Sequence, residues 1–74
     1  MLLAVDVGNT QTVFGTYDGT ALVEHWRLAT ERHHSGDALS LLYRGFLDLS
    51  AIDGICLSTT VPQLTRSYHE FADR

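Results

Sequence analysis

The first residues able to do chemistry are a carboxylate and a polar turn that follow an apolar run, in the sequence DVGNT. A bare carboxylate at the position of Asp6, at the end of that run, is costly unless a cation or a hydrogen bond satisfies it. Magnesium takes oxygen ligands and usually keeps several waters, so one aspartate can anchor it on phosphate groups. Gly8 has no Cβ atom and lets a phosphate approach the backbone. The residues therefore predict a phosphate-holding turn with Mg²⁺ at Asp6, bound directly or through water.

The polar residues around this turn add further hydrogen-bond donors. Asn9 brings an amide, and Thr10 and Thr12 bring hydroxyl groups. Successive backbone N–H groups of a turn can also form an anion-binding concavity. The same residue types build ordinary strand–turn–strand connections, so the short motif alone leaves a purely structural role open. The elements on either side have to support the chemical interpretation.

The first half of the sequence predicts an antiparallel meander of three strands. The first run is apolar on both faces, which is typical of a strand inside a sheet covered on both sides. Gly8-Asn9 and Asp18-Gly19 are two-residue hairpin signals. The third strand is expected to place Leu22, Glu24, Trp26 and Leu28 on one face. The three strands are predicted at residues 2–7, 11–17 and 21–28.

The second half changes to a helical period. Ser35 can cap a helix over residues 36–48, with apolar residues at helical spacing at Ala38, Leu41, Leu42, Phe46 and Leu49. A fourth strand is predicted at 52–57, and Thr60 with Gln63 has the form of a capping box before a second helix from about residue 62. The order βββαβα predicts an α/β fold, a mixed sheet with helices on its faces. This order resembles the start of the ribonuclease-H-like arrangement of the actin-like ATPases and sugar kinases.

The composition argues against several classes of protein and partner. The chain has 74 residues, and its single cysteine, Cys56, allows no internal disulfide and no cysteine-based zinc site. We expect this thiol to be buried and the protein to be cytoplasmic. A net charge of −4 without a basic cluster argues against nucleic acid as a partner. No apolar run approaches the ~18–20 residues of a membrane span, so no membrane partner is expected.

Four sequence blocks resemble the type III pantothenate kinases, of the acetate-and-sugar-kinase/actin superfamily. The opening MLLAVDVGNTQTVFGTYDG resembles the family's first phosphate motif, Asp-x-Gly-Asn-Thr, and HWRLAT at 25–30 resembles its Trp-Arg-x-x-Thr. SGDALSLLYRGFL at 35–47 resembles its Thr-Ala-Asp-Glu-Leu helix, and LSTTVPQLT at 57–65 resembles its Ser-Ser-Val-Val-Pro-x-Leu-Thr. The blocks keep the family's order and spacing. Among the departures, Gln11 stands where the family often has Asn.

The resemblance implies ATP-dependent phosphorylation of pantothenate, the first step of coenzyme A biosynthesis. It also implies a cytoplasmic homodimer that uses Mg²⁺ and a monovalent cation, K⁺ or NH₄⁺. By the same resemblance Asp6 lies near the magnesium. The residues that contact the ATP phosphates would be Asp6, Val7, Gly8, Asn9, Thr10, Gln11, Thr12 and Val13.

Family members are much longer than this sequence, and their catalytic base is the aspartate of a Gly-x-Asp-Arg motif. That motif does not occur in residues 1–74, where Asp73-Arg74 lacks the glycine. We therefore expect 1–74 to be an incomplete N-terminal nucleotide-binding domain, with the catalytic aspartate and a second domain beyond Arg74. This piece alone is expected to be inactive.

Two other functions stay open at this point. A stand-alone, non-catalytic nucleotide-binding or regulatory module would carry the same motifs. A magnesium-dependent nuclease of ribonuclease-H-like shape would also use a carboxylate on the first strand, but two-metal chemistry needs several converging carboxylates. The fourth strand ends in Ser58-Thr59 with no acid there, and Asp53 lies at its other end. This distribution disfavours the nuclease.

Overall fold

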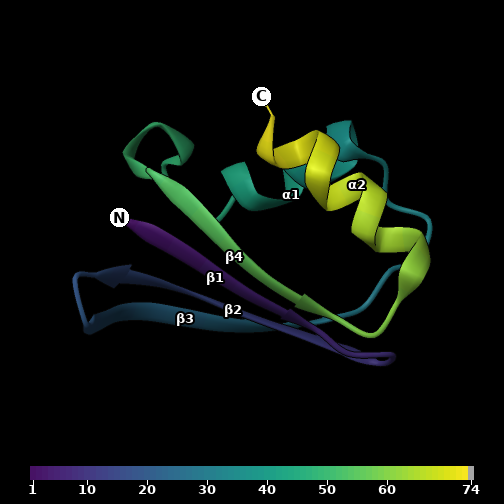
Figure 1. Cartoon of the computed structure of the whole chain (residues 1–74), viewed down its shortest axis with the longest axis horizontal. Helices are drawn as coiled ribbons and strands as arrows, with labels where there is room; N and C mark the ends of the chain where they lie inside the picture. Colours follow the sequence, from purple (N-terminus) through teal and green to yellow (C-terminus); the bar gives the residue numbers. More distant parts are fainter. Residues whose placement is uncertain (74) are drawn as a thin grey trace.

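The computed structural model describes residues 1–73 and has an α/β fold with one mixed sheet and two helices (Figure 1). The predicted order βββαβα is confirmed, with small shifts at the ends of the elements. Within residues 1–73, no helix is long and apolar enough to cross a membrane. The elements are β1 (Leu2–Val7), β2 (Gln11–Asp18), β3 (Ala21–Ala29), α1 (Gly36–Arg44), the 3-10 helix η1 (Leu49–Ala51), β4 (Gly54–Thr59) and α2 (Pro62–Ala72).

The sheet has the strand order β3-β2-β1-β4, so β1 is an internal strand. It pairs antiparallel with β2 and parallel with β4. The register places Asp6 opposite Val13 on β2 and opposite Ser58 on β4. Because β1 and β4 run parallel, their carboxyl ends meet at one edge of the sheet, where the β1–β2 connection also lies.

Both helices lie on the same face of the sheet, above it in Figure 1. On this covered face Leu3, Val5 and Val7 of β1 are buried, whereas Leu2 and Asp6 on the opposite face are exposed. The mixed sheet is confirmed, and within residues 1–73 the helices cover one of its two faces. We call the opposite side the uncovered face.

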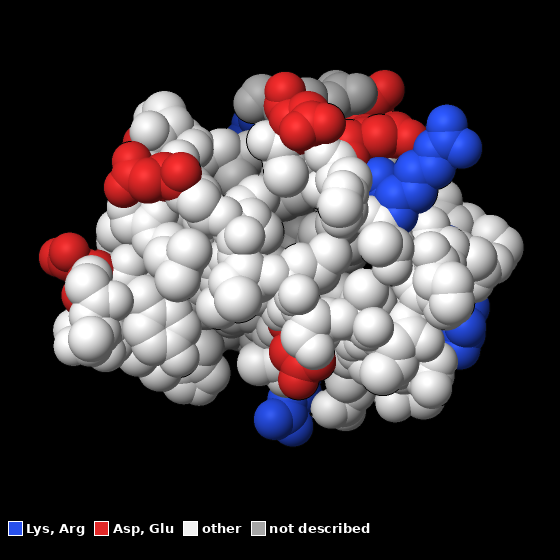
Figure 2. Space-filling model, in the orientation of Figure 1, with Lys and Arg blue, Asp and Glu red and all other residues white. Residues whose placement is uncertain are grey.

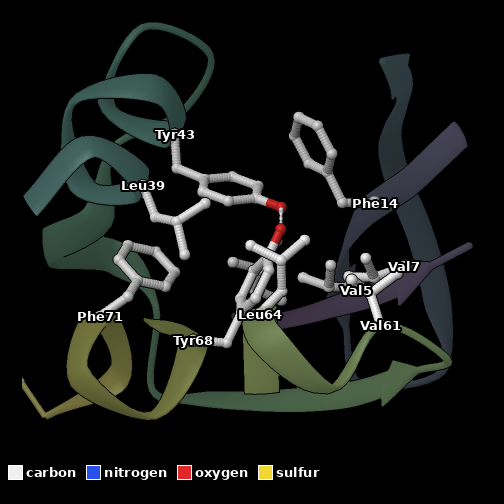
Figure 3. Packing of buried hydrophobic residues seen from close by; sticks show 10 residues of the cluster. Val5, Val7, Phe14, Leu39, Tyr43, Val61, Leu64, Tyr68 and Phe71 are labelled. Atoms are coloured by element: carbon white, nitrogen blue, oxygen red, sulfur yellow. Dashed lines mark hydrogen bonds between the residues drawn. The ribbon is translucent and has the colours of Figure 1, made fainter. Parts of the chain in front are cut away.

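The core fills the space between the covered face and the helices (Figure 3). Phe14 of β2 is stacked on Trp26 at a centroid distance of 5.1 Å and edge-on to Tyr43 at 4.6 Å. The hydroxyl oxygens of Tyr43 and Tyr68 are 2.6 Å apart and join α1 to α2. Burial raises the pKa of both phenol groups above their ordinary value of 10.0. The other buried apolar residues are Leu3, Val5, Val7, Leu39, Val61, Leu64 and Phe71.

Helix α1 begins as predicted but ends earlier. The Ser35 side chain accepts a hydrogen bond from the Ala38 N–H at 3.1 Å, which confirms the cap. The helix ends at Arg44 instead of residue 48, because Gly45 closes its last turn. A second cap follows at Asp48, whose carboxylate accepts the Ser50 N–H at 3.0 Å and starts η1.

The predicted apolar stripe of this helix is wrong at Leu41, whereas Leu42 and Leu49 pack against the core as predicted. Leu39 and Tyr43 are buried, while Leu41 is 68% exposed. The i, i+4 pair Leu39 and Tyr43 faces the sheet and α2, so packing against two neighbours fixes the rotation. Periodicity alone assigned Leu41 to the wrong side.

Strand β3 contains a bulge that moves Leu22 to the uncovered face. The register passes from Glu24 directly to Leu22 and leaves Val23 without a partner. An unpaired extra residue shifts the alternation of side chains by one position. Leu22 therefore pairs with Tyr17 and does not share the face of Trp26, as the simple alternation predicted.

Cys56 is exposed, which contradicts the expected buried thiol. Its register partner on β1 is Ala4, which also belongs to the uncovered face. The apolar run in β4 is thus divided between the two faces, and the alternation of the strand places the cysteine outside the core.

Candidate phosphate-binding site

The β1–β2 connection is a loop of three residues, Gly8–Thr10, in place of the two-residue turn that Gly8-Asn9 predicted. The Gly8 N–H donates to the Gln11 carbonyl oxygen at 2.9 Å and closes the loop. Among residues 1–73 the positive φ angles are confined to Gly19, so no residue of this loop is left-handed. A Cβ atom on Gly8 would lie 3.0 Å from the Gln11 carbonyl oxygen. Glycine is needed here because the loop's own backbone approaches closely.

The free donors of the loop belong to Asn9 and Thr10. Their backbone N–H groups and the Thr10 hydroxyl make no hydrogen bond within residues 1–73, whereas the Gly8 N–H is occupied by Gln11. Both residues are exposed. Neighbouring backbone N–H groups that point to solvent are suited to bind an anion such as a phosphate.

A pair of threonines supports the loop from inside the protein. Thr30, directly after β3, donates from Oγ1 to the Gly8 carbonyl oxygen at 2.8 Å, and the Oγ1 atoms of Thr30 and Thr12 are also 2.8 Å apart. A hydroxyl group has one proton, and that of Thr30 goes to the carbonyl, so Thr12 is the donor of the second bond. Thr12 is only 6% exposed. Its hydroxyl supports the loop in this structure, and a direct phosphate contact from it stays a prediction.

The other predicted phosphate contacts lie on both sides of the sheet. The Val7 side chain is buried in the core, and its carbonyl oxygen accepts the Thr60 N–H at 3.1 Å. Gln11 is exposed at the start of β2, and Val13 is half-buried on the uncovered face. The structure therefore brings Asp6 and residues 8–11 to one edge of the sheet, with Val7 contributing only backbone there.

The capping box predicted from Thr60 is wrong. Val61 is the N-cap of α2, without a side-chain hydrogen bond, and Pro62 is the first helical residue. Proline suits this position because its missing N–H is one that the helix would not use. Thr60 instead hydrogen-bonds to β1 through its N–H, while the Thr59 hydroxyl accepts the Val61 N–H at 3.0 Å. The β4–α2 connection is thereby tied to the end of β1.

Asp6 is exposed on the uncovered face and stands between Ser58 and Val13 in the register. Asp6 and Ser58 line a hollow of the sheet together with larger side chains, among them Tyr17, Leu22 and His25. Within residues 1–73, no three His, Cys, Asp or Glu side chains gather into a metal-binding group. One free carboxylate fits a Mg²⁺ ion whose remaining ligands are waters and phosphate oxygens. The register neighbours of Asp6 supply no second carboxylate for two-metal nuclease chemistry.

Arg32 is a candidate site residue that the sequence did not reveal. Its Nη2 atom donates to the Asn9 side-chain oxygen at 3.3 Å, so a guanidinium group lies beside the loop. No periodicity or turn signal marks this residue, because the contact joins two loops that are far apart in the sequence. The chain carries five basic and nine acidic residues, and those visible in Figure 2 are scattered around the outline of the molecule. Within residues 1–73, the groups at the loop that can bind an anion are thus the backbone N–H groups of Asn9 and Thr10 and the Arg32 guanidinium.

Comparisons with known proteins identify the family. The family model described as type III pantothenate kinase matches residues 2–74. The chain belongs to the type III pantothenate kinases. The resemblance found in the four sequence blocks is thereby confirmed.

Three type III pantothenate kinases illustrate the similarity. The enzyme of Frankia alni is 46% identical over 74 residues, that of Salinispora arenicola 42% over 76, and that of Streptomyces avermitilis 39% over 83. Each match includes the whole of this chain. The chain spans about 30% of the length of these pantothenate kinases.

Proposed function

We propose that the chain is the N-terminal nucleotide-binding part of a kinase that transfers the γ-phosphate of ATP to pantothenate. Membership of the type III pantothenate kinases supports the choice of reaction. One structural observation carries the assignment of the site. The loop Gly8–Thr10 leaves two adjacent backbone N–H groups free, beside the exposed carboxylate of Asp6, at the edge where β1 and β4 end. In open α/β sheets this is the edge at which ligands bind.

The residues of this chain would bind and orient the nucleotide. The N–H groups of Asn9 and Thr10 and the Thr10 hydroxyl would donate to phosphate oxygens, and Arg32 would add a positive charge. Asp6 would hold Mg²⁺, directly or through water, and the ion would neutralise charge on the phosphates. Phosphoryl transfer depends mainly on positioning and charge neutralisation, so such contacts are a substantial share of catalysis.

Other parts of the proposed enzyme lie outside residues 1–74. The proposal takes the general base to be the aspartate of a Gly-x-Asp-Arg motif beyond Arg74, together with a second domain and a site for K⁺ or NH₄⁺. It also takes the complete enzyme to be a cytoplasmic homodimer. Family membership supports these assignments.

The proposal is tested by pantothenate-dependent ATP consumption in the protein as its cell makes it. We expect turnover that requires both Mg²⁺ and pantothenate, and none from residues 1–74 alone. Binding of Mg·ATP without phosphorylation of pantothenate would contradict the kinase assignment and favour a non-catalytic module. Turnover by the 74-residue chain would show that the general base lies within it.

A further inference from the structure

Thr30 makes three hydrogen bonds, two to the β1–β2 loop and one to Thr12 of β2. Its Oγ1 donates to the Gly8 carbonyl oxygen at 2.8 Å and accepts from the Thr12 hydroxyl at 2.8 Å. Its backbone N–H donates to the Thr10 carbonyl oxygen at 3.0 Å. A single residue after β3 thus holds the carbonyl group at each end of the loop.

The bond to Gly8 determines where the next N–H group points. In a trans peptide the C=O and N–H groups lie in one plane and point in opposite directions. The Gly8 carbonyl and the Asn9 N–H belong to the same peptide unit, and no cis peptide bond occurs in residues 1–73. When Thr30 draws the Gly8 carbonyl toward the protein, the Asn9 N–H is turned outward. This N–H is one of the two that the loop leaves free.

The end of β3 is itself firmly placed. Trp26 stacks on Phe14 in the core, and Thr12 is buried on the neighbouring strand. Hydrogen bonds in a chain reinforce one another, and this chain runs from Thr12 through Thr30 to the Gly8 carbonyl. The loop is therefore tied through Thr30 to a buried residue of β2.

We propose that Thr30 is a positioning residue for the nucleotide, whose hydroxyl aims the Asn9 N–H at a phosphate of ATP. The inference rests on the proposed function and deepens it. It gives a role to the threonine of the Trp-Arg-x-x-Thr block, which the assignment of the phosphate motif left unused. Thr30 does not touch the nucleotide in this account.

Thr30→Val and Thr30→Ser test the proposal in the complete protein. Valine keeps the shape and removes the hydroxyl, whereas serine keeps the hydroxyl. We expect Thr30→Val to weaken Mg·ATP binding about tenfold, because the Gly8 carbonyl loses its donor and the Asn9 N–H its fixed direction. KM for pantothenate should stay unchanged, and Thr30→Ser should restore the ATP affinity. Calorimetric titration with Mg·ATP and steady-state kinetics provide the two readouts.

Thr16→Val is the matched control, because Thr16 is a buried threonine of β2 without a contact to the loop. It should leave ATP affinity unchanged even where it lowers the melting temperature. Unchanged ATP affinity in Thr30→Val would overturn the proposal, as would equal losses for ATP and pantothenate that serine does not restore. If Thr30→Val does not fold, Thr30→Ala replaces it, and equal ATP affinities of the alanine and serine variants would be the contradicting result.

The behaviour of the unmodified protein separates this inference from the proposed function. If the unmodified protein does not bind Mg·ATP, the proposed function fails and the role of Thr30 fails with it. If the unmodified protein binds Mg·ATP and Thr30→Val binds it equally well, the inference about Thr30 fails alone.

Discussion

Two connections join antiparallel strands at opposite ends of the sheet, and they are built differently. The β2–β3 turn has two residues, Gly19 and Thr20, and Gly19 has a φ angle of 61°. A Cβ atom on Gly19 would meet nothing within 4 Å. The loop Gly8–Thr10 has no left-handed residue and receives hydrogen bonds from Thr30 and Arg32. The conformation of the β2–β3 turn is determined by its own backbone. The conformation of the loop Gly8–Thr10 is determined by tertiary contacts.

In the proposed function, this difference separates a turn that only reverses the chain from a loop that binds a ligand. Gly19 fits a two-residue hairpin of type II′, in which only the first central residue has a positive φ angle. The other loop has help from two distant residues, yet Asn9 and Thr10 keep unused N–H groups. Support from outside combined with free donors is the arrangement expected of a preorganised binding loop.

The largest effect is expected from the carboxylate next to the loop. If the proposed function holds, Asp6→Asn should lower the pantothenate kinase rate of the complete protein about a hundredfold or more, because the Mg²⁺ proposed at Asp6 would lose its anchor. Asp18→Asn, at the opposite turn, is the matched control and should leave the rate unchanged. Steady-state kinetics at saturating ATP measure both variants. Near-normal turnover of Asp6→Asn would remove Asp6 from the site.

Substitutions of Gly8 and Gly19 should separate an effect on Mg·ATP binding from an effect on the unfolding free energy. Gly8→Ala places a Cβ atom 3.0 Å from the Gln11 carbonyl oxygen, and the resulting shift of the loop should weaken Mg·ATP binding about tenfold. Gly19→Ala should cost about 1 kcal/mol of unfolding free energy, because alanine resists a left-handed conformation. It should leave ATP affinity unchanged. Calorimetric titration measures the affinity for Mg·ATP, and chemical denaturation measures the unfolding free energy. A loss of ATP affinity in Gly19→Ala would contradict the assignment of nucleotide binding to the Gly8–Thr10 loop alone.

A smaller effect is expected in the core, away from both connections. Tyr68→Phe leaves the buried Tyr43 hydroxyl without its partner and should cost about 1 kcal/mol of unfolding free energy. The double variant with Tyr43→Phe should recover most of this loss, since both polar groups are then gone. ATP affinity should not change in either variant. Tyr68→Phe and the double variant thus show how far a general loss of stability affects nucleotide binding. A double variant less stable than Tyr68→Phe would contradict the stabilising role of the tyrosine pair.

The same tyrosines make the stability of the unmodified protein sensitive to alkaline pH. Their folded pKa values are raised above the ordinary 10.0 by burial, so the unfolded chain releases these protons first. The stabilisation by the neutral hydroxyl groups is complete below about pH 10 and decreases as the pH rises further. Denaturation midpoints measured across that range should fall in the unmodified protein and fall less in the double phenylalanine variant.

Patterns of neighbouring residues in the sequence predicted those elements, caps and turns whose structure depends on neighbouring residues. The order of the elements and the Ser35 cap follow from residues that are close together in the sequence. The two connections were predicted to within one residue, since the second turn is Gly19-Thr20 where Asp18-Gly19 was expected. Asp6 and the loop were predicted as a site for the same reason. The Leu39 and Tyr43 face of α1 was missed, because its rotation depends on packing against the sheet and α2 together.

Tertiary contacts decided the rest of the site. The bulge at Val23 places Leu22 on the uncovered face, and nothing in the alternating pattern marks it. Arg32 and Thr30 act on a loop that precedes them by two strands, so their roles become visible only when the sheet is assembled. Thr12 was predicted as a phosphate donor from its hydroxyl, and the direction of that hydroxyl depends on Thr30.

Amide hydrogen exchange of the complete protein, with and without Mg·ATP, tests the central claim most directly. The N–H groups of Asn9 and Thr10 have no partner within residues 1–73 and should exchange fast in the free protein. We predict that Mg·ATP slows exchange at residues 8–10 and leaves the turn at Gly19 and Thr20 unchanged. Saturation with Mg·ATP that leaves residues 8–10 unprotected would contradict the assignment of this loop as the phosphate site.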